Sequence, residues 1–244
     1  MKIAGAVALV TGASRGLGWA YANALVEHGA RTVCAGARDP SRLTDPALTP
    51  IRLDITDEQD VAAAAELCSG VTLLINNAGI ATGTALLGAP SMEFARAEME
   101  TNYFGTLRMC RAFGPVLARN GGGALVNMLS VVSFFNWPSG GSQCASKAAE
   151  WSLTNGVRME LRSQGTLVVG VHASFIDTDL TAELPVPKLA PSDVANQTLD
   201  AVEEGREEVL ADERTRNIKA ALPRDLDLIY PDVEKQWRAA FGSQ

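Results

Sequence analysis

The chain has few metal-ligating residues and little positive charge. Among 244 residues there are only two histidines, His28 and His172, and the four cysteines are scattered without a Cys-x-x-Cys pair. A metal site is therefore not expected, because structural zinc sites need clusters of such ligands. Lysine and arginine total 21 against 28 aspartates and glutamates, a net charge of −7. This balance argues against nucleic acid or an anionic membrane surface as a partner.

Long apolar runs are also absent. The first one, Ala4 to Val10, covers about seven residues, whereas a membrane-spanning helix needs roughly 18 or more. It leads into Thr11-Gly12 and not into a small-residue cleavage site, so a first β-strand explains it better than a signal peptide. Scattered cysteines suit a reducing compartment. We therefore expect a cytoplasmic protein that does not associate with membranes.

The composition, 47% hydrophobic and 20% charged, is that of a soluble globule. Short apolar runs alternate with longer amphipathic ones, the pattern of parallel strands joined by helical crossovers. No linker or repeat interrupts it, so we predict one domain over residues 1–244. Its fold class is α/β, a Rossmann-type doubly wound parallel sheet of about seven strands with helices on both faces. The expected strands are Val7–Val10, Thr32–Ala35, Ile51–Leu53, Thr72–Ile75, Ala124–Met128, Leu167–Val171 and Glu208–Leu210.

Helices are expected between these strands, one of them beginning with a capping box at Thr56-Asp57-Glu58-Gln59. Ligands of such sheets bind beyond the carboxyl ends of the strands. The turn-rich segments 133–142 and 178–191 follow the fifth and sixth strands and are therefore expected to form the substrate loops. The expected helices cover Gly16–His28, Thr56 to about Leu67, Pro90 past Asn102 to Arg119, and Ser192 to about Gly205.

A glycine-rich segment, Gly12-Ala13-Ser14-Arg15-Gly16-Leu17-Gly18, joins the first strand to the first helix. Glycines there allow a tight turn and close approach to a pyrophosphate, which the N–H groups at the helix start bind. Glycine can also simply relieve strain in a strand–helix connection, but this spacing in this place favours a dinucleotide. No Lys-Ser/Thr follows the last glycine, so the segment is not a Walker A loop.

The residues after the second strand favour NADP(H) over NAD(H). An acid that would accept the ribose hydroxyls of NAD is missing, because Gly36 stands about where it would be. Arg38 follows shortly, and Arg15 lies in the glycine-rich segment. Two guanidinium groups suit a 2′-phosphate. Alternatively, both are solvated surface arginines.

These features, with Asn76-Asn77-Ala78-Gly79 after the fourth strand, resemble the short-chain dehydrogenase/reductase superfamily over almost the whole chain. Asn102, Ser130 and Lys147 match its catalytic asparagine, serine and lysine. The resemblance implies hydride transfer between NADP(H) and a small carbonyl or alcohol substrate, in a homodimer or homotetramer. It also implies contacts to the cofactor from Gly12, Ser14, Arg15, Gly16, Leu17, Gly18, Arg38, Asp54, Ile55, Asn77, Ala78, Gly79, Lys147, Ile176 and Thr178.

In that family a tyrosine is the general acid, and the lysine lowers its pKa and binds the nicotinamide ribose. The serine holds the substrate oxygen, and the asparagine supports a water-linked proton relay. This chain has Gln143 at the tyrosine position, four residues before Lys147 and thirteen after Ser130, so the catalytic set becomes Asn102, Ser130, Gln143 and Lys147. A second departure is Ala173-Ser174, where the family commonly has Pro-Gly.

A glutamine amide donates a hydrogen bond but does not titrate near neutral pH. Without a general acid, ketone reduction should be slower by about 10²–10⁴-fold. Gln143 is therefore an introduced substitution, or a natural variant for an acceptor such as an iminium that needs no proton, or a mark of an NADP(H)-binding protein with little turnover. Because Asn102, Ser130 and Lys147 are retained, we favour redox chemistry in an altered form.

Two further features stay open at this stage. His172 ends the sixth strand and could transfer a proton, although a lone histidine in a strand is more typical of packing. Phe134, Phe135 and Trp137 are expected either as pocket walls for an apolar substrate or as core anchors.

Overall fold

The computed structural model describes residues 1–241 and is built on a parallel sheet, whose strands pair in the order β3-β2-β1-β4-β5-β6-β7. The predicted Rossmann-type sheet is confirmed, with its topological switch point between β1 and β4. Residues 242–244 of the predicted domain lie outside the described part. The strands are β1 Val7–Thr11, β2 Thr32–Ala37, β3 Thr49–Arg52, β4 Leu73–Asn76, β5 Ala124–Met128, β6 Leu167–His172 and β7 Glu208–Leu210.

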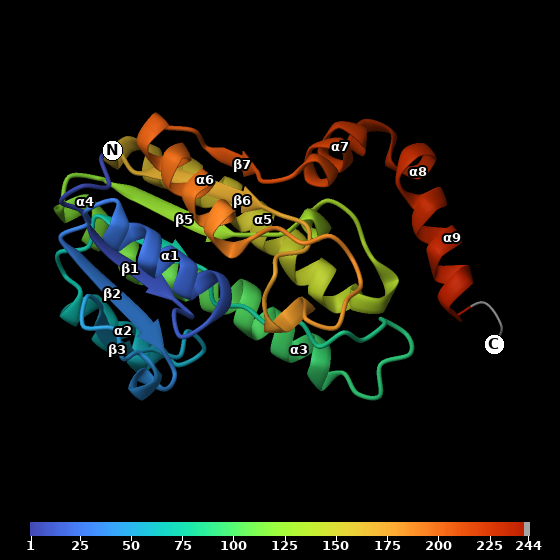
Figure 1. The fold of residues 1–244 in the computed structure, drawn as a ribbon, viewed down its shortest axis with the longest axis horizontal. Helices are drawn as coiled ribbons and strands as arrows, with labels where there is room; N and C mark the ends of the chain where they lie inside the picture. The colour runs from blue at the N-terminus through green and yellow to red at the C-terminus, as the bar shows by residue number, and fades with distance from the viewer. Residues whose placement is uncertain (242–244) are drawn as a thin grey trace.

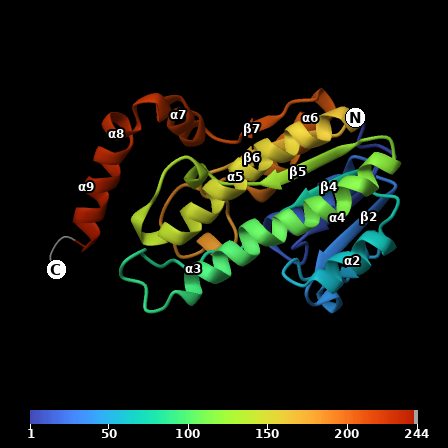
Figure 2. The same cartoon turned by 180° about the vertical axis from the view of Figure 1, so that it is seen from behind.

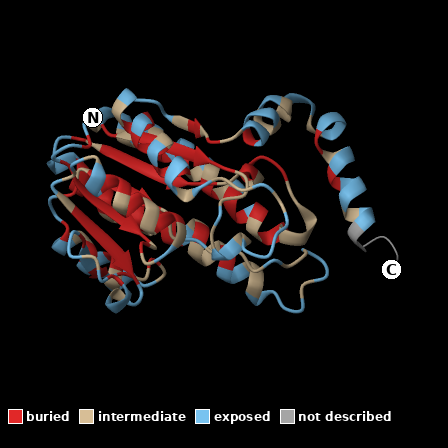
Figure 3. Ribbon diagram, viewed as in Figure 1, coloured by how far each residue is buried: buried red, intermediate tan, exposed pale blue. Residues whose placement is uncertain are grey.

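Helices cover both faces of the sheet, as predicted. Figure 1 shows α1 (Gly16–Glu27) and α6 (Pro191–Glu204) side by side on the near face. Figure 2 shows α2 (Glu58–Leu67), α4 (Thr106–Arg119) and α5 (Gly141–Leu161) on the opposite face. Consecutive residues of the central strands β1, β4 and β5 belong to opposite cores, so these strands are buried on both sides, whereas the edge strand β3 is mostly exposed (Figure 3).

The helical run before β5 is continuous but not uniform. It begins with α3 (Glu93–Glu98) and passes through a π-helical segment, Met99–Gly105, into α4. The predicted start at Pro90 is thus three residues too early. π-Helical turns are rare and occur frequently at functional sites. Here the π-helical segment contains Asn102, which is fully buried.

Two local predictions are wrong. The cap of α2 is Asp57 and not Thr56: the Asp57 carboxylate accepts the N–H of Gln59 at 2.8 Å, while the Thr56 hydroxyl donates to Asp54. A carboxylate at a helix start gains from the helix dipole, which a hydroxyl does not. Strand β3 begins two residues before the predicted one and contains Pro50, which an edge strand tolerates because no outer neighbour needs its N–H.

The C-terminal helices α7 (Glu213–Ala221), α8 (Asp225–Leu228) and α9 (Tyr230–Phe241) form an arm that extends beyond the sheet (Figure 1, red). Among residues 1–241, no helix has both the length and the hydropathy to cross a membrane. Short 3₁₀ segments occur at Pro40–Arg42, Val131–Ser133, Pro138–Gly140, Arg162–Gln164, Asp179–Thr181 and Leu222–Arg224.

Candidate functional site

The glycine-rich loop after β1 depends on its glycines for its shape. Gly12 and Gly16 have φ values of +66° and +54°, a region that favours glycine. A Cβ at Gly18 would overlap the Gly12 carbonyl oxygen and lie 2.7 Å from Nδ2 of Asn77. Arg15 precedes α1 and makes no side-chain cap among the described residues, so the first N–H groups of α1 stay available to an anion.

The segment after β4, residues 77–79, is hydrogen-bonded to Thr11, which directly precedes the glycine-rich loop. The Thr11 hydroxyl accepts the N–H groups of Asn77 and Ala78, each at 2.9 Å, and the Asn77 amide donates to the Thr11 carbonyl. A Cβ at Gly79 would lie 3.1 Å from Oδ1 of Asn102 and 3.7 Å from Nζ of Lys147. The segment therefore joins the glycine-rich loop to the polar cluster predicted as catalytic.

At the end of β2, position 36 has no room for a side chain, whereas Arg38 is exposed. A Cβ at Gly36 would lie 2.8 Å from a methyl carbon of Leu53 and 3.2 Å from the Val10 carbonyl oxygen. Arg38 is exposed at the same end of the sheet. The pKa of Asp54 is lowered: burial acts to raise it, but the hydrogen bonds from Thr56 and the charges of Arg38 and Arg52 outweigh burial. Arg38 thus places a positive charge close to Asp54 at this end of the sheet.

The loop 178–191 reaches back to the glycine-rich loop. Arg15 forms an ion pair with Asp179, with 2.9 Å between Nη1 and Oδ2, and both side chains are exposed. A Cβ at Gly16 would touch Thr178 at 3.2 Å. Ile176 forms a β-bridge with Leu189 at the base of this loop. The predicted substrate loop therefore lies over the start of α1. Of the other predicted cofactor contacts, Ser14 is half-buried, and Leu17, Gly18 and Ile55 are buried.

Three polar pairs connect the helical run α3–α4 to α5, and we call them the polar ladder. The residues of each helix are four positions apart, so each helix presents all three on one face. Asn102 donates to Oγ of Ser146 at 2.8 Å, and Thr106 donates to Oε1 of Glu150 at 3.1 Å. Sequence reasoning missed the ladder, although four-residue spacing of polar residues in apolar helices was its signal. The three pairs are Glu98–Ser142, Asn102–Ser146 and Thr106–Glu150.

On α5, Gln143 directly follows Ser142 and Lys147 directly follows Ser146, both of which belong to the polar ladder. Lys147 is buried; its ammonium donates to the Met128 carbonyl at 2.7 Å and forms an ion pair with Glu150, also at 2.7 Å. Gln143 lies one turn earlier and is half-buried. Ser130 is likewise half-buried, and its Oγ accepts the N–H of Val132 at 3.3 Å. A hydroxyl that accepts one bond still has its proton to donate.

Asn102 uses both of its amide hydrogens within the protein. Its amide donates both hydrogens, to the Ile80 carbonyl at 3.0 Å and to Ser146. Its Oδ1 accepts the N–H of Ile80 at 2.9 Å. The residue thus joins the segment after Gly79 to α5, which sequence reasoning did not foresee.

His172 and its aromatic neighbours form a packed cluster. His172 is fully buried and stacks on Phe134 with 4.3 Å between ring centroids, and its Nδ1 lies 3.1 Å from the Ser130 carbonyl oxygen. Burial lowers its pKa to about 4, so it is neutral at pH 7. Phe134 and Phe135 are both buried, and Phe135 packs in a cluster with Ile229 and Val233 of the C-terminal arm. The two phenylalanines are therefore core anchors.

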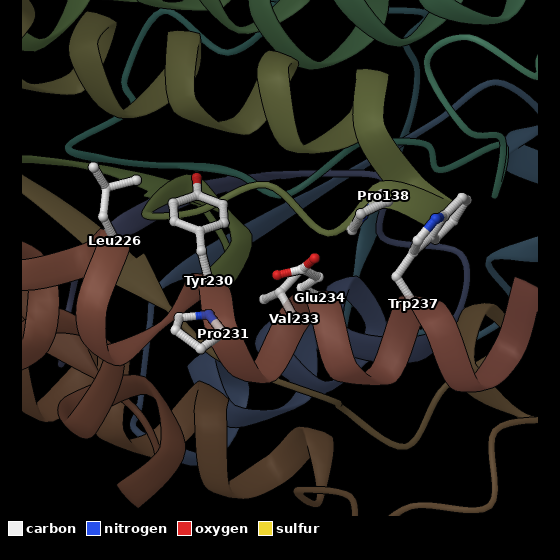
Figure 4. Close-up of a pocket in the computed structure, with 7 residues that line it drawn as sticks. All are labelled: Pro138, Leu226, Tyr230, Pro231, Val233, Glu234 and Trp237. Atoms are coloured by element: carbon white, nitrogen blue, oxygen red, sulfur yellow. The ribbon is translucent and has the colours of Figure 1, made fainter. Parts of the chain in front are cut away.

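A hollow with a volume of about 330 Å³ lies between α9 and the loop that contains Pro138. Figure 4 shows the side chains that line it. No sequence motif indicated it, because most of its lining residues are apolar or aromatic side chains of the C-terminal arm. None of its lining residues belongs to the predicted site, but Pro138 lies in the predicted substrate loop 133–142. The lining residues are Pro138, Leu226, Tyr230, Pro231, Val233, Glu234 and Trp237.

Comparison with known proteins agrees with this arrangement. Residues 6–188 match the family model described as short chain dehydrogenase. A 3-oxoacyl-(acyl-carrier-protein) reductase of Vibrio cholerae is 32% identical over 193 residues, covering 75% of this chain and 79% of the relative. A short chain dehydrogenase from Burkholderia cenocepacia, solved in complex with NADP, is 43% identical with a TM-score of 0.91, covering 96% of this chain and 99% of that one. A short chain dehydrogenase/reductase from Burkholderia phymatum, solved with NAD, is 25% identical with a TM-score of 0.83, covering 97% and 96%.

Proposed function

The chain belongs to the short-chain dehydrogenase family, and from this premise we propose that it is an NADP(H)-dependent oxidoreductase that transfers hydride to a carbonyl or a related acceptor. The observation that carries the proposal is the meeting of Gly79, Asn102 and Lys147 beside the glycine-rich loop. Residues 1–244 act as one catalytic domain, with residues 178–191 as its substrate loop. We further propose that the protein is cytoplasmic and forms a homodimer or homotetramer; the exposed Phe104 and Met159 on the outer helices support an oligomer.

The residues present fit a dinucleotide. Gly18 packs so closely on Gly12 that a Cβ at this position would overlap the Gly12 carbonyl oxygen, and the turn is therefore tight. The tight turn and the uncapped start of α1 suit a pyrophosphate at the glycine-rich loop. Arg38 suits a 2′-phosphate, and the Burkholderia cenocepacia relative was solved with NADP. Residues 12–18 would hold the pyrophosphate. Asp54 and Ile55 would contact the adenine, residues 77–79 would line the path to the nicotinamide, and Ile176 and Thr178 would contact its carboxamide.

The bound cofactor supplies the hydride, and the side chains orient the acceptor. In this proposal the Ser130 hydroxyl and the Gln143 amide donate hydrogen bonds to the acceptor atom. Lys147 uses two of its three N–H donors within the protein, so one remains for the nicotinamide ribose. Asn102 acts by holding α5 and the segment after Gly79 in place, because its amide hydrogens are both engaged.

A second candidate function follows from Gln143 itself. Ketone reduction yields an alkoxide that must gain a proton, and a glutamine amide does not provide one near neutral pH. An iminium acceptor is already cationic, so hydride addition gives a neutral amine directly. The same site would therefore serve, without a tyrosine, a reductase whose acceptor is an iminium or an imine already protonated when it binds.

Two measurements test the proposal. The purified protein is titrated with NADPH and with NADH, and the loss of NADPH absorbance is then followed with ketones, aldehydes and cyclic imines. We expect saturable NADPH binding and turnover of at least one acceptor class. Binding without turnover of any acceptor would identify an NADP(H)-binding protein instead, and no saturable binding would overturn the assignment.

The preference for NADP(H) gives a separate prediction about Arg38. A hydrogen bond to a charged group contributes about 1.5–3 kcal/mol, so Arg38→Ala should weaken NADPH binding roughly 10- to 100-fold. NADH binding should stay nearly the same, because NADH has no 2′-phosphate. Arg31→Ala removes an exposed arginine at the opposite end of β2 and is the matched control. Equal losses for NADPH and NADH would show that Arg38 does not read the phosphate.

A further inference from the structure

Lys147 and Glu150 form an ion pair that the sequence did not predict. Their side chains are only 10% and 1% exposed, and 2.7 Å separates Nζ from Oε2. Thr106 of α4 donates to the other carboxylate oxygen of Glu150, and Met128 of β5 accepts a second hydrogen from Lys147. The pair is thus fixed by contacts from α4 and from the sheet as well as within α5.

The positive charge of Lys147 is balanced by the negative charge of Glu150, and both residues lie on α5. An unpaired ammonium or carboxylate is costly at such burial. Burial raises the pKa of the Glu150 carboxyl, and the Lys147 ammonium opposes that rise. Two other titratable groups face the pair, and both are neutral at pH 7. Burial and Glu150 raise the pKa of the Cys110 thiol on α4 to about 12, and burial holds His172 on β6 uncharged. Glu150 is therefore the group that balances the charge of Lys147.

We propose that Glu150 is a positioning residue of this site: it neutralises Lys147 within α5, so that the lysine is a fixed hydrogen-bond donor and not a free positive charge beside position 143. The inference rests on the proposed function and extends it. A free lysine charge is useful beside a phenol that must give up a proton, but Gln143 has no such proton. We therefore regard Gln143 and Glu150 as two parts of the same change: the site has neither a phenol nor an uncompensated lysine charge to act on it.

The test introduces a phenol as a probe and titrates it in the absence of cofactor. Its ionisation in Gln143→Tyr is followed by ultraviolet difference absorbance, with Gln143→Phe as the blank for the natural tyrosines. We expect an almost ordinary pKa, near 10. Adding Glu150→Gln, which keeps the size of the side chain, should lower that pKa by about one unit, because the lysine charge is then uncompensated. The blank for this pair is Gln143→Phe with Glu150→Gln.

The matched control is Gln143→Tyr with Glu160→Gln, which removes an exposed carboxylate further along α5 and should leave the phenol pKa unchanged. Equal titration of the Glu150→Gln and Glu160→Gln proteins would overturn the proposal. If Glu150→Gln leaves too little folded protein, Gln143→Tyr alone decides: a phenol pKa lowered by about two units would mean that the lysine charge acts freely. Because no cofactor is present, a failure of NADPH binding would overturn the proposed function without affecting this result.

Discussion

Gln143→Tyr should accelerate NADPH-dependent reduction of ketones by about 10²-fold, the lower end of what a positioned general acid contributes. The phenol would stand one turn before Lys147 on α5, at the position that the resemblance assigns to the family's proton donor. It would protonate the alkoxide, a step that the amide leaves to water. The gain is limited because Glu150 already neutralises Lys147, 2.7 Å away, so the phenol stays a weak acid. Initial rates of NADPH oxidation with a panel of ketones measure the effect.

Gln143→Phe is the control, because it provides the ring without the hydroxyl and should reduce ketones no faster than the natural protein. Protonated cyclic imines should be reduced at about the same rate by the Gln143→Tyr and unsubstituted proteins, since an iminium needs no proton and gains nothing from the phenol. If Gln143→Tyr binds NADPH normally and yet all the ketones stay inert, proton donation at position 143 is not what limits the reaction.

Acid should destabilise the protein through His172, by about 3 kcal/mol between pH 6.5 and pH 4. In the unfolded chain the imidazole has its ordinary pKa of 6.5, whereas burial lowers the folded value to about 4. Between these values the unfolded state binds more protons, so the stability contribution is complete above pH 6.5 and falls as the pH approaches 4. Urea unfolding at several pH values within this window measures the loss.

The natural protein is compared with His172→Gln, which keeps a polar side chain next to the Ser130 carbonyl but does not titrate. Carboxylates add a pH dependence common to both proteins, so the difference between their two stability curves isolates the histidine. The variant should be less stable at pH 7, since the stack on Phe134 is lost, but its curve should be flatter. Parallel curves would mean that His172 titrates alike in the folded and unfolded states.

The sheet could be predicted because parallel strands buried on both faces leave an unmistakable apolar signal. Ala124–Met128 and Glu208–Leu210 were predicted with the bounds that the structure has. The prediction of β3 was wrong at its start because Pro50 is typical of a loop, and only the position of this strand at the sheet edge explains why the proline is tolerated. Local propensity does not contain that information.

The candidate site was predictable where a motif is contiguous and not where it depends on tertiary contacts. The glycines of the loop after β1 and the spacing of Ser130, Gln143 and Lys147 are visible in the sequence itself. The ion pair between Arg15 and Asp179 joins residues 164 positions apart, and no periodicity predicts it. Glu150 lies three residues after Lys147, but only its burial distinguishes this pair from an ordinary solvated pair on a helix surface.

The polar ladder fixes the position of α5, and therefore of Gln143 and Lys147, independently of the loop that precedes the helix. Turning α5 about its axis, or sliding it by one residue, would break all three rungs together, so the helix has a single register against its neighbour. Residues 136–140 precede α5 and, unlike the buried Phe134 and Phe135, are only partly buried. Exchanges in this part of the predicted substrate loop are therefore expected to leave Gln143 and Lys147 in place, which makes it the first target for redesigning selectivity.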